Sequence, residues 1–136
     1  MISACSKTDF SDIDGNRGAF SDYHGKWLVI NYWATWCKPC LQEIPELNQF
    51  ADKHADTVKL FAVDFDQSQG DALIASSEKM GISFSVLTAD PAPILQFEPP
   101  TVLPTTIIFN PKGQLHRTLL GPQTAESLRQ AMALTQ

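Results

Sequence analysis

The sequence predicts an α/β fold in which one mixed central sheet has helices on both faces. Two apolar, β-rich segments, residues 27–33 and 58–65, are typical of strands buried on both sides. Each is followed by apolar residues at helical spacing, which indicates strand–helix units with parallel, right-handed crossovers. The final third of the chain carries the pattern of an antiparallel hairpin and a closing helix, so we expect a mixed sheet.

Length and composition fit a single domain, which we expect to span residues 9–136. Hydrophobic residues make up 43% of the 136 residues and charged residues 18%, enough apolar material for a core. Ten basic and fifteen acidic residues give a formal net charge of −5, and Lys and Arg are not clustered. Nucleic acid is therefore not an expected partner. The longest apolar stretch, residues 27–34, is too short to cross a bilayer.

Residues 1–8 are expected to form a leader or tether in front of the domain. Ile2-Ser3-Ala4-Cys5 is similar to the end of a bacterial lipobox, in which small residues precede a cysteine that becomes lipidated. This interpretation makes Cys5 a lipid anchor and implies that the earlier part of a signal peptide is missing from the sequence. The alternative is an incidental cysteine, and the sequence leaves both open.

The first predicted elements are a hairpin, a buried strand and a helix. Residues 9–23 contain Asp14-Gly15-Asn16, a turn signal between two short segments that can pair. Residues 27–33 form the strand, and the apolar residues after it recur three or four positions apart, which predicts an amphipathic helix. The expected buried positions of this helix are Leu41, Ile44, Leu47 and Phe50 or Ala51.

The middle of the chain predicts a second helix and a proline-rich loop. Residues 71–80 have the helical pattern and stop at Gly81, since glycine readily takes the left-handed conformation of a helix end. A short strand is expected at residues 84–87. Residues 90–104 hold five of the nine prolines, so we expect a loop with one helical turn near residues 94–97.

The C-terminal segment predicts a hairpin and a last helix. Strands are expected at residues 105–109 and 115–120, on either side of a turn at residues 110–113. Thr124 has the side chain of a helix N-cap and precedes a helix expected over residues 125–134.

Cys37 and Cys40 form a Cys-x-x-Cys pair where the buried strand meets the first helix. Only the thiolate attacks, and the unpaired N–H groups at a helix start stabilise that anion. Lys38 adds a positive charge, while Pro39 suits a first helical turn, where its missing N–H costs nothing. We expect Cys37 to be the exposed nucleophile and Cys40 the shielded resolving thiol in thiol–disulfide exchange.

Two other roles of a Cys-x-x-Cys pair are zinc binding and a structural disulfide. A zinc site needs a second pair of ligands, but the chain offers only Cys5 and three scattered histidines, His24, His54 and His116, which we expect at the surface. No metal site is therefore expected. A structural disulfide that closes so short a loop restricts the unfolded chain little, so stability alone is a weak reason for it.

The chain resembles the thioredoxin superfamily, and in particular the TlpA/ResA/DsbE-like thiol–disulfide oxidoreductases of the bacterial envelope. The similarity rests on residues 31–40 (Asn-Tyr-Trp-Ala-Thr-Trp-Cys-Lys-Pro-Cys), residues 43–47 (Glu-Ile-Pro-Glu-Leu) and Leu103-Pro104-Thr105-Thr106. The resemblance implies a thioredoxin fold with an N-terminal β-hairpin and an insertion before the proline loop. It also implies a cis peptide bond at Pro104, with the backbone of Leu103 pairing with an extended substrate segment.

Other positions gain expected roles from this resemblance. Ordinary thioredoxins have a buried aspartate where this chain has Asn31, which cannot titrate. The proton-transfer role then shifts to Glu43, three residues after Cys40, with a pKa raised by partial burial. Trp36 is expected to cover the sulfurs and contact substrates, whereas Trp33 and Trp27 are expected in the core.

The resemblance implies a monomeric reductase of protein disulfides in the bacterial periplasm, without a cofactor. Its substrates would include apocytochrome c or other envelope proteins, and a membrane donor of the DsbD/CcdA type would supply electrons. An oxidase or isomerase direction is the close alternative. Handling of Cu(I) by the two thiolates is another. A peroxidase is not expected, because Thr35 and Cys37 do not form the Pro-x-x-x-Thr-x-x-Cys pattern of that class.

Overall fold

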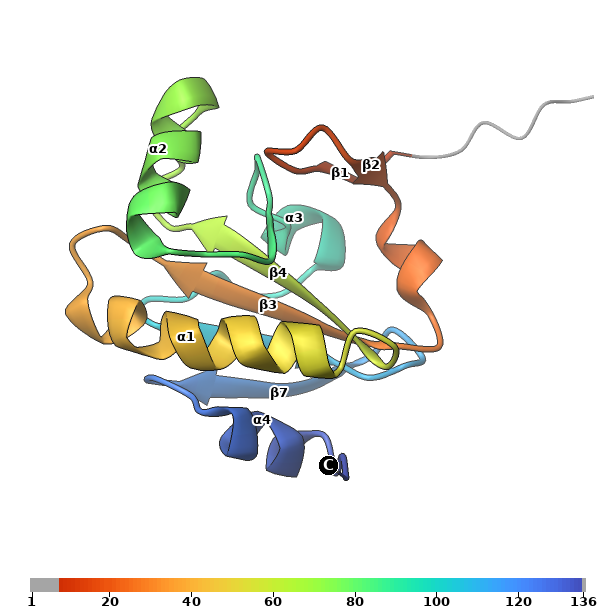
Figure 1. Cartoon of the computed structure of the whole chain (residues 1–136). Helices are drawn as coiled ribbons and strands as arrows, with labels where there is room; N and C mark the ends of the chain where they lie inside the picture. The colour runs from red at the N-terminus through yellow and green to blue at the C-terminus, as the bar shows by residue number, and fades with distance from the viewer. Residues whose placement is uncertain (1–7, 136) are drawn as a thin grey trace, which may run out of the picture.

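The computed structural model, which describes residues 8–135, contains a five-stranded mixed sheet in the order β5-β4-β3-β6-β7. The central strand β3 pairs in parallel with β4 and antiparallel with β6. The edge strands are β5, parallel to β4, and β7, antiparallel to β6. Figure 1 labels β3, β4 and β7 of this sheet. The strands are β3 Trp27–Trp33, β4 Val58–Asp64, β5 Ser85–Val86, β6 Thr105–Phe109 and β7 Leu115–Leu120.

The predicted N-terminal hairpin is present. Strands β1 (Phe10–Ser11) and β2 (Arg17–Gly18) pair antiparallel. The turn between them is held by Asp12, whose carboxylate accepts hydrogen bonds from the backbone N–H groups of Asp14 and Asn16, both at 2.9 Å. A short 3-10 helix, η1 (Phe20–Tyr23), leads from the hairpin toward β3.

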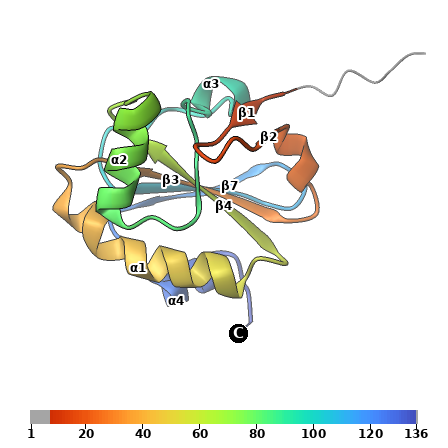
Figure 2. The same ribbon diagram turned by 45° about the horizontal axis from the view of Figure 1, so that its top comes forward.

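Helices lie on both faces of the sheet, as predicted. Helices α1 (Lys38–Lys53) and α4 (Ala125–Ala131) cover one face, while the hairpin and α3 (Ala92–Leu95) lie on the other side (Figure 2). Helix α2 (Gly70–Met80) packs with the α1 side through its buried residues. It ends at Gly81, whose φ of 77° is the left-handed conformation expected there.

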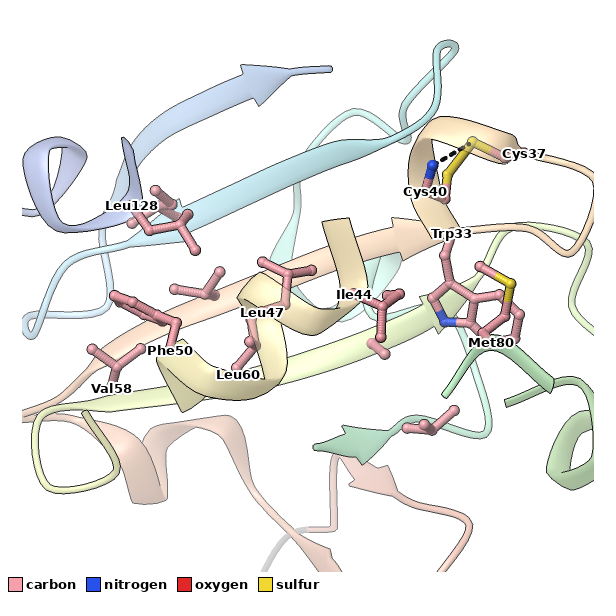
Figure 3. Packing of buried hydrophobic residues seen from close by; sticks show 14 of the residues in the cluster. Trp33, Cys37, Cys40, Ile44, Leu47, Phe50, Val58, Leu60, Met80 and Leu128 are labelled. Atoms are coloured by element: carbon pink, nitrogen blue, oxygen red, sulfur yellow. Dashed lines mark hydrogen bonds between the residues drawn. A yellow bond between two sulfur atoms is a disulfide. The ribbon is translucent and has the colours of Figure 1, made fainter. Parts of the chain in front are cut away.

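The alternation of side chains along β3 divides the core into two clusters. Val29 and Trp33 pack with α1 and α2 on one face, and Figure 3 shows Trp33 beside Met80. Ile30 and Tyr32 point to the opposite face, where they meet the aromatic residues of the hairpin side. Because β3 is covered on both faces, its nearly continuous apolar sequence is explained, and the expected fold class is confirmed.

Several local predictions differ from the structure. Leu41 was expected on the buried face of α1 but is 47% exposed, because the first turn of this helix directs Cys40, and not Leu41, into the core. His54 was expected at the surface but is 8% exposed, since its ring packs against the ring of Phe50, one helical turn earlier. The helical turn near residues 94–97 begins earlier, at Ala92, and the last helix ends at Ala131.

Within residues 8–135, none of the helices has both the length and the apolar character that a bilayer span requires.

Candidate active site

The cysteine pair lies at the junction of β3 and α1. Cys37 is the N-cap of α1, with an extended backbone (φ −94°, ψ 101°) that turns the chain from sheet into helix. Its Sγ accepts a hydrogen bond from the backbone N–H of Cys40 at 3.2 Å, which Figure 3 marks with a dashed line. The two residues form a disulfide across a Cα–Cα distance of 5.3 Å. A thiolate at position 37 would therefore receive one of the unpaired N–H groups of the helix start.

The two sulfurs differ in accessibility, although less than predicted. Cys37 was expected to be exposed, but only 5% of the residue is, while Cys40 is completely buried. The difference arises because residue 37 caps the helix just after the end of the central strand, whereas residue 40 lies in the core beside Trp33. An attacking group can thus reach Cys37 first. Lys38 and Pro39, the first two residues of α1, are both exposed.

The loop before β6 has the geometry that the resemblance implied. The Leu103–Pro104 bond is cis. The carbonyl oxygen of Pro104 accepts a hydrogen bond from the N–H of Gly121 at 2.9 Å, and Thr105 Oγ1 donates to the carbonyl of Val102 at 2.7 Å. Leu103 is partly buried and packs against both core clusters. The loop is therefore held on both sides of its proline.

Glu43 is a buried carboxylate one turn of α1 beyond Cys40, and it is only 2% exposed. Its Oε1 accepts a hydrogen bond from Asn31 Nδ2, and its Oε2 accepts one from the backbone N–H of Gln123, both at 2.7 Å. Burial raises the pKa of Glu43 to about 7, although these two donors pull in the opposite direction. The expected raised pKa is confirmed, and the carboxyl group can exchange a proton near neutral pH.

Asn31 completes a small polar cluster inside the apolar face. It is fully buried on β3, and its Nδ2 also donates to Thr106 Oγ1 at 3.2 Å, on the neighbouring strand β6. Its Oδ1 has no hydrogen-bond partner among the described residues. The cluster thus joins β3, α1 and β6 at the end of the sheet that carries the cysteines.

Trp36 stands outside the core. Its side chain is 65% exposed, its Nε1 donates a hydrogen bond to Asp66 Oδ2 at 2.8 Å, and its ring meets Phe65 edge-on. These contacts orient the indole ring. Trp33, in contrast, is fully buried, and Trp27 is partly buried against the core, as predicted.

Two groups of the site were not foreseen. The N–H of Gln123 reaches Glu43 from 80 residues away in sequence, and Asp66 holds Trp36 from the turn after β4. A backbone donor has no sequence signal. Asp66 lies between the predicted strand at residues 58–65 and the predicted helix at residues 71–80, in a segment to which no role was assigned. Among residues 8–135, no group of three or more His, Cys, Asp or Glu side chains is placed to hold a metal ion.

Comparison with known proteins identifies the family. Residues 4–118 match the AhpC/TSA family. The chain belongs to the AhpC/TSA family. A relative from Bacillus subtilis strain 168 named thiol-disulfide oxidoreductase ResA is 31% identical over 124 residues, which cover 90% of this chain and 69% of the relative. The thioredoxin-like protein YneN from the same strain is 30% identical over 130 residues, 93% of this chain and 76% of YneN.

A solved structure has a similar fold. The crystal structure of StoA from Bacillus subtilis has a TM-score of 0.72 and 26% sequence identity, covering 90% of this chain and 92% of StoA. The thioredoxin fold and the resemblance stated above are therefore confirmed. This member of the AhpC/TSA family is an enzyme of the thiol–disulfide oxidoreductase class, with its cysteine pair at disulfide distance.

Proposed function

We propose that this protein is a disulfide reductase for protein substrates in the bacterial envelope, with Cys37 as nucleophile and Cys40 as resolving thiol. The observation that supports it most directly is the asymmetry of the pair, since Cys37 is 5% exposed and receives an N–H donor while Cys40 is completely buried. The less accessible sulfur is suited to an intramolecular second step.

The reaction proceeds by two exchanges. The Cys37 thiolate attacks one sulfur of the substrate disulfide, forms a mixed disulfide, and releases the first substrate thiolate. Cys40 then loses its proton and attacks Cys37 Sγ, which closes the internal disulfide and releases the second substrate thiolate. The substrate gains two electrons and two protons, and the enzyme dithiol is oxidised by the same two electrons.

Glu43 is proposed to accept the proton of Cys40 in the second exchange. Its place one helical turn beyond Cys40 and its pKa of about 7 support this role, because a base with a pKa near the working pH is the most effective. Once Cys40 has attacked, the protonated Glu43 can return the proton toward the departing substrate thiolate or to water.

Substrate contacts are proposed on both sides of the cysteines. On one side, the backbone of Leu103 would pair with an extended substrate segment while the ring of Pro104 packs beside the mixed disulfide. On the other, Trp36 offers an exposed indole already oriented by Asp66. Lys38 and Pro39 form the exposed rim between them.

The proposal includes the physiological setting expected from the sequence. The protein would act as a monomer in the periplasm, tethered through a lipid on Cys5, which lies outside the described residues. Apocytochrome c or other envelope proteins would be its substrates, and a membrane protein of the DsbD/CcdA type its electron donor. Mass spectrometry of the native membrane fraction tests the anchor, and a diacylglyceryl adduct on Cys5 is the expected result.

The direction of electron flow is tested by equilibrating the Cys37–Cys40 pair with glutathione. A reductase should have a potential well below that of the glutathione couple, whereas a potential near −120 mV, typical of a strong oxidant, would overturn the reductase assignment. Alkylation of the free thiols followed by mass spectrometry gives the oxidised fraction at each glutathione ratio.

A further inference from the structure

We propose that Asn31 is a positioning residue that holds Glu43 in both its ionised and its protonated form, by presenting Nδ2 to the carboxylate and Oδ1 to the carboxylic acid. The inference rests on the proposed role of Glu43 as proton acceptor and names the group that lets this carboxyl titrate inside the core.

The two carboxyl oxygens of Glu43 have different hydrogen-bond partners. Oε2 faces the backbone N–H of Gln123 at 2.7 Å, and a backbone N–H can only donate. Oε2 must therefore remain an acceptor in both states. A proton that is itself to be hydrogen-bonded has to sit on Oε1, which faces Asn31 Nδ2 at 2.7 Å.

The groups on the Oε1 side of Glu43 can act either as donors or as acceptors. A carboxamide carries a donor at one end and an acceptor at the other, in nearly the same shape, so a half turn of the amide exchanges them. Thr106 Oγ1, the other partner of Nδ2 at 3.2 Å, is a hydroxyl that can accept or donate. Glu43 and Thr106 can thus both change from acceptors to donors when the amide turns. The carboxylic acid then donates to Oδ1, and the Thr106 hydroxyl donates to the same atom.

Asn31 Oδ1 is the atom that would accept the hydrogen bond from the protonated Glu43. Buried polar atoms are nearly always paired, yet Oδ1 of this fully buried residue has no partner among the described residues. In the ionised cluster the Glu43 carboxylate has no proton to donate to it, and the N–H of Gln123 is already bonded to Oε2. In the turned amide one atom, Nδ2, is again unpaired, so the two orientations make the same number of hydrogen bonds. The protonation of Glu43 is then what selects between them.

The charged and titratable groups around the cluster do not take the place of Asn31 as the hydrogen-bond partner of Glu43 Oε1. Glu46, one turn farther along α1, accepts from the N–H of Ala125 at 2.9 Å. From the β7–α4 loop Glu43 receives only the N–H of Gln123, and from β6 the cluster receives the Thr106 hydroxyl. The Cys40 thiol of the reduced protein, on the same helix, is the proton donor that Glu43 is proposed to serve.

The turning of the amide is tested by NMR on the intact oxidised protein. The ¹³C shift of the Glu43 carboxyl and the ¹⁵N and ¹H shifts of the Asn31 side-chain amide are followed from pH 5 to 9. We expect all of them to titrate with one midpoint, and the contacts from the Asn31 NH₂ protons to Glu43 to disappear below it. An Asn31 amide whose shifts and contacts stay constant while Glu43 titrates would overturn the proposal.

The kinetic test uses Asn31→Leu, with Asn48→Leu as a matched control. Asn48 also makes two hydrogen bonds, to Gly81 and Ser83, but does not contact Glu43. Asn31→Leu removes a hydrogen bond from both forms of Glu43. The hydrogen bond to the ionised carboxylate is the stronger of the two, so the pH midpoint of the Cys40 step should move upward by about one unit. The Asn48 variant should keep the wild-type midpoint.

The same substitution in a Glu43→Gln background separates positioning from folding. There Asn31→Leu should leave the pH profile unchanged, since the group it positions no longer titrates. An equal shift in both backgrounds would overturn the proposal. The NMR titration needs no reductase activity and no variant. It therefore still decides the role of Asn31 if Asn31→Leu fails to fold or if the protein proves not to be a reductase.

Discussion

The two ends of α1 both bury an ionisable side chain, but they surround it differently. Near the N-terminal end, Glu43 is 2% exposed and receives donors from β3 and from the loop before α4. At the C-cap, His54 is 8% exposed, lies against the Phe50 ring at 4.7 Å, and has a ring Nε2 without a partner among the described residues.

The two buried groups differ in whether both of their protonation states are accessible near neutral pH. The donors around Glu43 partly offset the cost of burying its charge, so its pKa of about 7 leaves both forms accessible. Burial lowers the pKa of His54, with Arg129 and Lys53 acting in the same direction, so the neutral form of this ring is favoured. Changes near the N-terminal end should therefore alter exchange kinetics, and changes near the C-terminal end should alter stability.

The largest expected effect is the loss of disulfide exchange in Cys37→Ser, next to the N-terminal end of α1. The substitution should abolish turnover in an insulin or model-disulfide reduction assay, because the nucleophile is gone, while the fold is retained. Cys40→Ser is the companion variant. Its Cys37 thiolate should still attack the substrate disulfide, and the mixed disulfide should accumulate and be visible by mass spectrometry. Turnover by the Cys37 variant would contradict the assignment of the nucleophile.

At the other end of the helix, Phe50→Ala should lower the free energy of unfolding by about 3–5 kcal/mol, since it empties a fully packed site in the core. Urea unfolding of the oxidised protein measures it. Leu115, which is 54% exposed, provides a control, and Leu115→Ala should cost less than about 1 kcal/mol. A Phe50 variant whose exchange shows a shifted pH midpoint would show that the two ends are coupled.

Glu43→Gln should slow the Cys40 step by about 10- to 100-fold at neutral pH and remove the inflection near pH 7, because the proton acceptor is lost. Stopped-flow measurement across pH 5–9 gives the profile. An unchanged inflection would exclude Glu43 from the mechanism.

The same variant has a thermodynamic signature. The folded pKa of Glu43, about 7, lies above the ordinary value of 4.5, so the folded state binds the proton more tightly than the unfolded chain. This contribution to stability is complete below pH 4.5 and is lost as the pH rises through 7. The stability of Glu43→Gln relative to wild type should accordingly increase over that interval.

The smallest effect is expected from His54→Phe. The folded pKa of His54 lies below its ordinary value of 6.5, so the unfolded chain binds the proton more tightly. Stability from this group is present above pH 6.5 and declines as the pH falls below it. The variant should lose less stability than wild type between pH 7 and 5 in parallel urea titrations. An equal loss would show that folding does not lower the pKa of His54.

Most of the framework around the site could be predicted from local patterns. The strand at residues 27–33 matches β3 residue for residue, because a segment buried on both faces must be apolar almost throughout. The position of Cys37 at the start of a helix follows from the change in periodicity after the strand. The resemblance supplied the cis geometry of Pro104, which no local pattern specifies.

Predictions failed where the outcome depended on packing between distant segments. Leu41 has the spacing of a core residue, but it is 47% exposed while Cys40, in the same turn, is completely buried. The burial of His54 and the low exposure of Cys37 are decided in the same way, by what packs over each end of α1. Sequence spacing shows which side chains share a helix face, and it does not show how far along that face the protein extends.

By itself, the sequence determined the order of strands and helices, the placement of two cysteines at a strand–helix junction, and a carboxylate one turn beyond them. These features are local, because backbone periodicity and helix geometry are set by neighbouring residues. Only the tertiary structure decided that a backbone N–H from residue 123 and an amide from residue 31 would surround that carboxylate. A pKa depends on the groups that folding brings into contact, and those groups come from segments far apart in the chain.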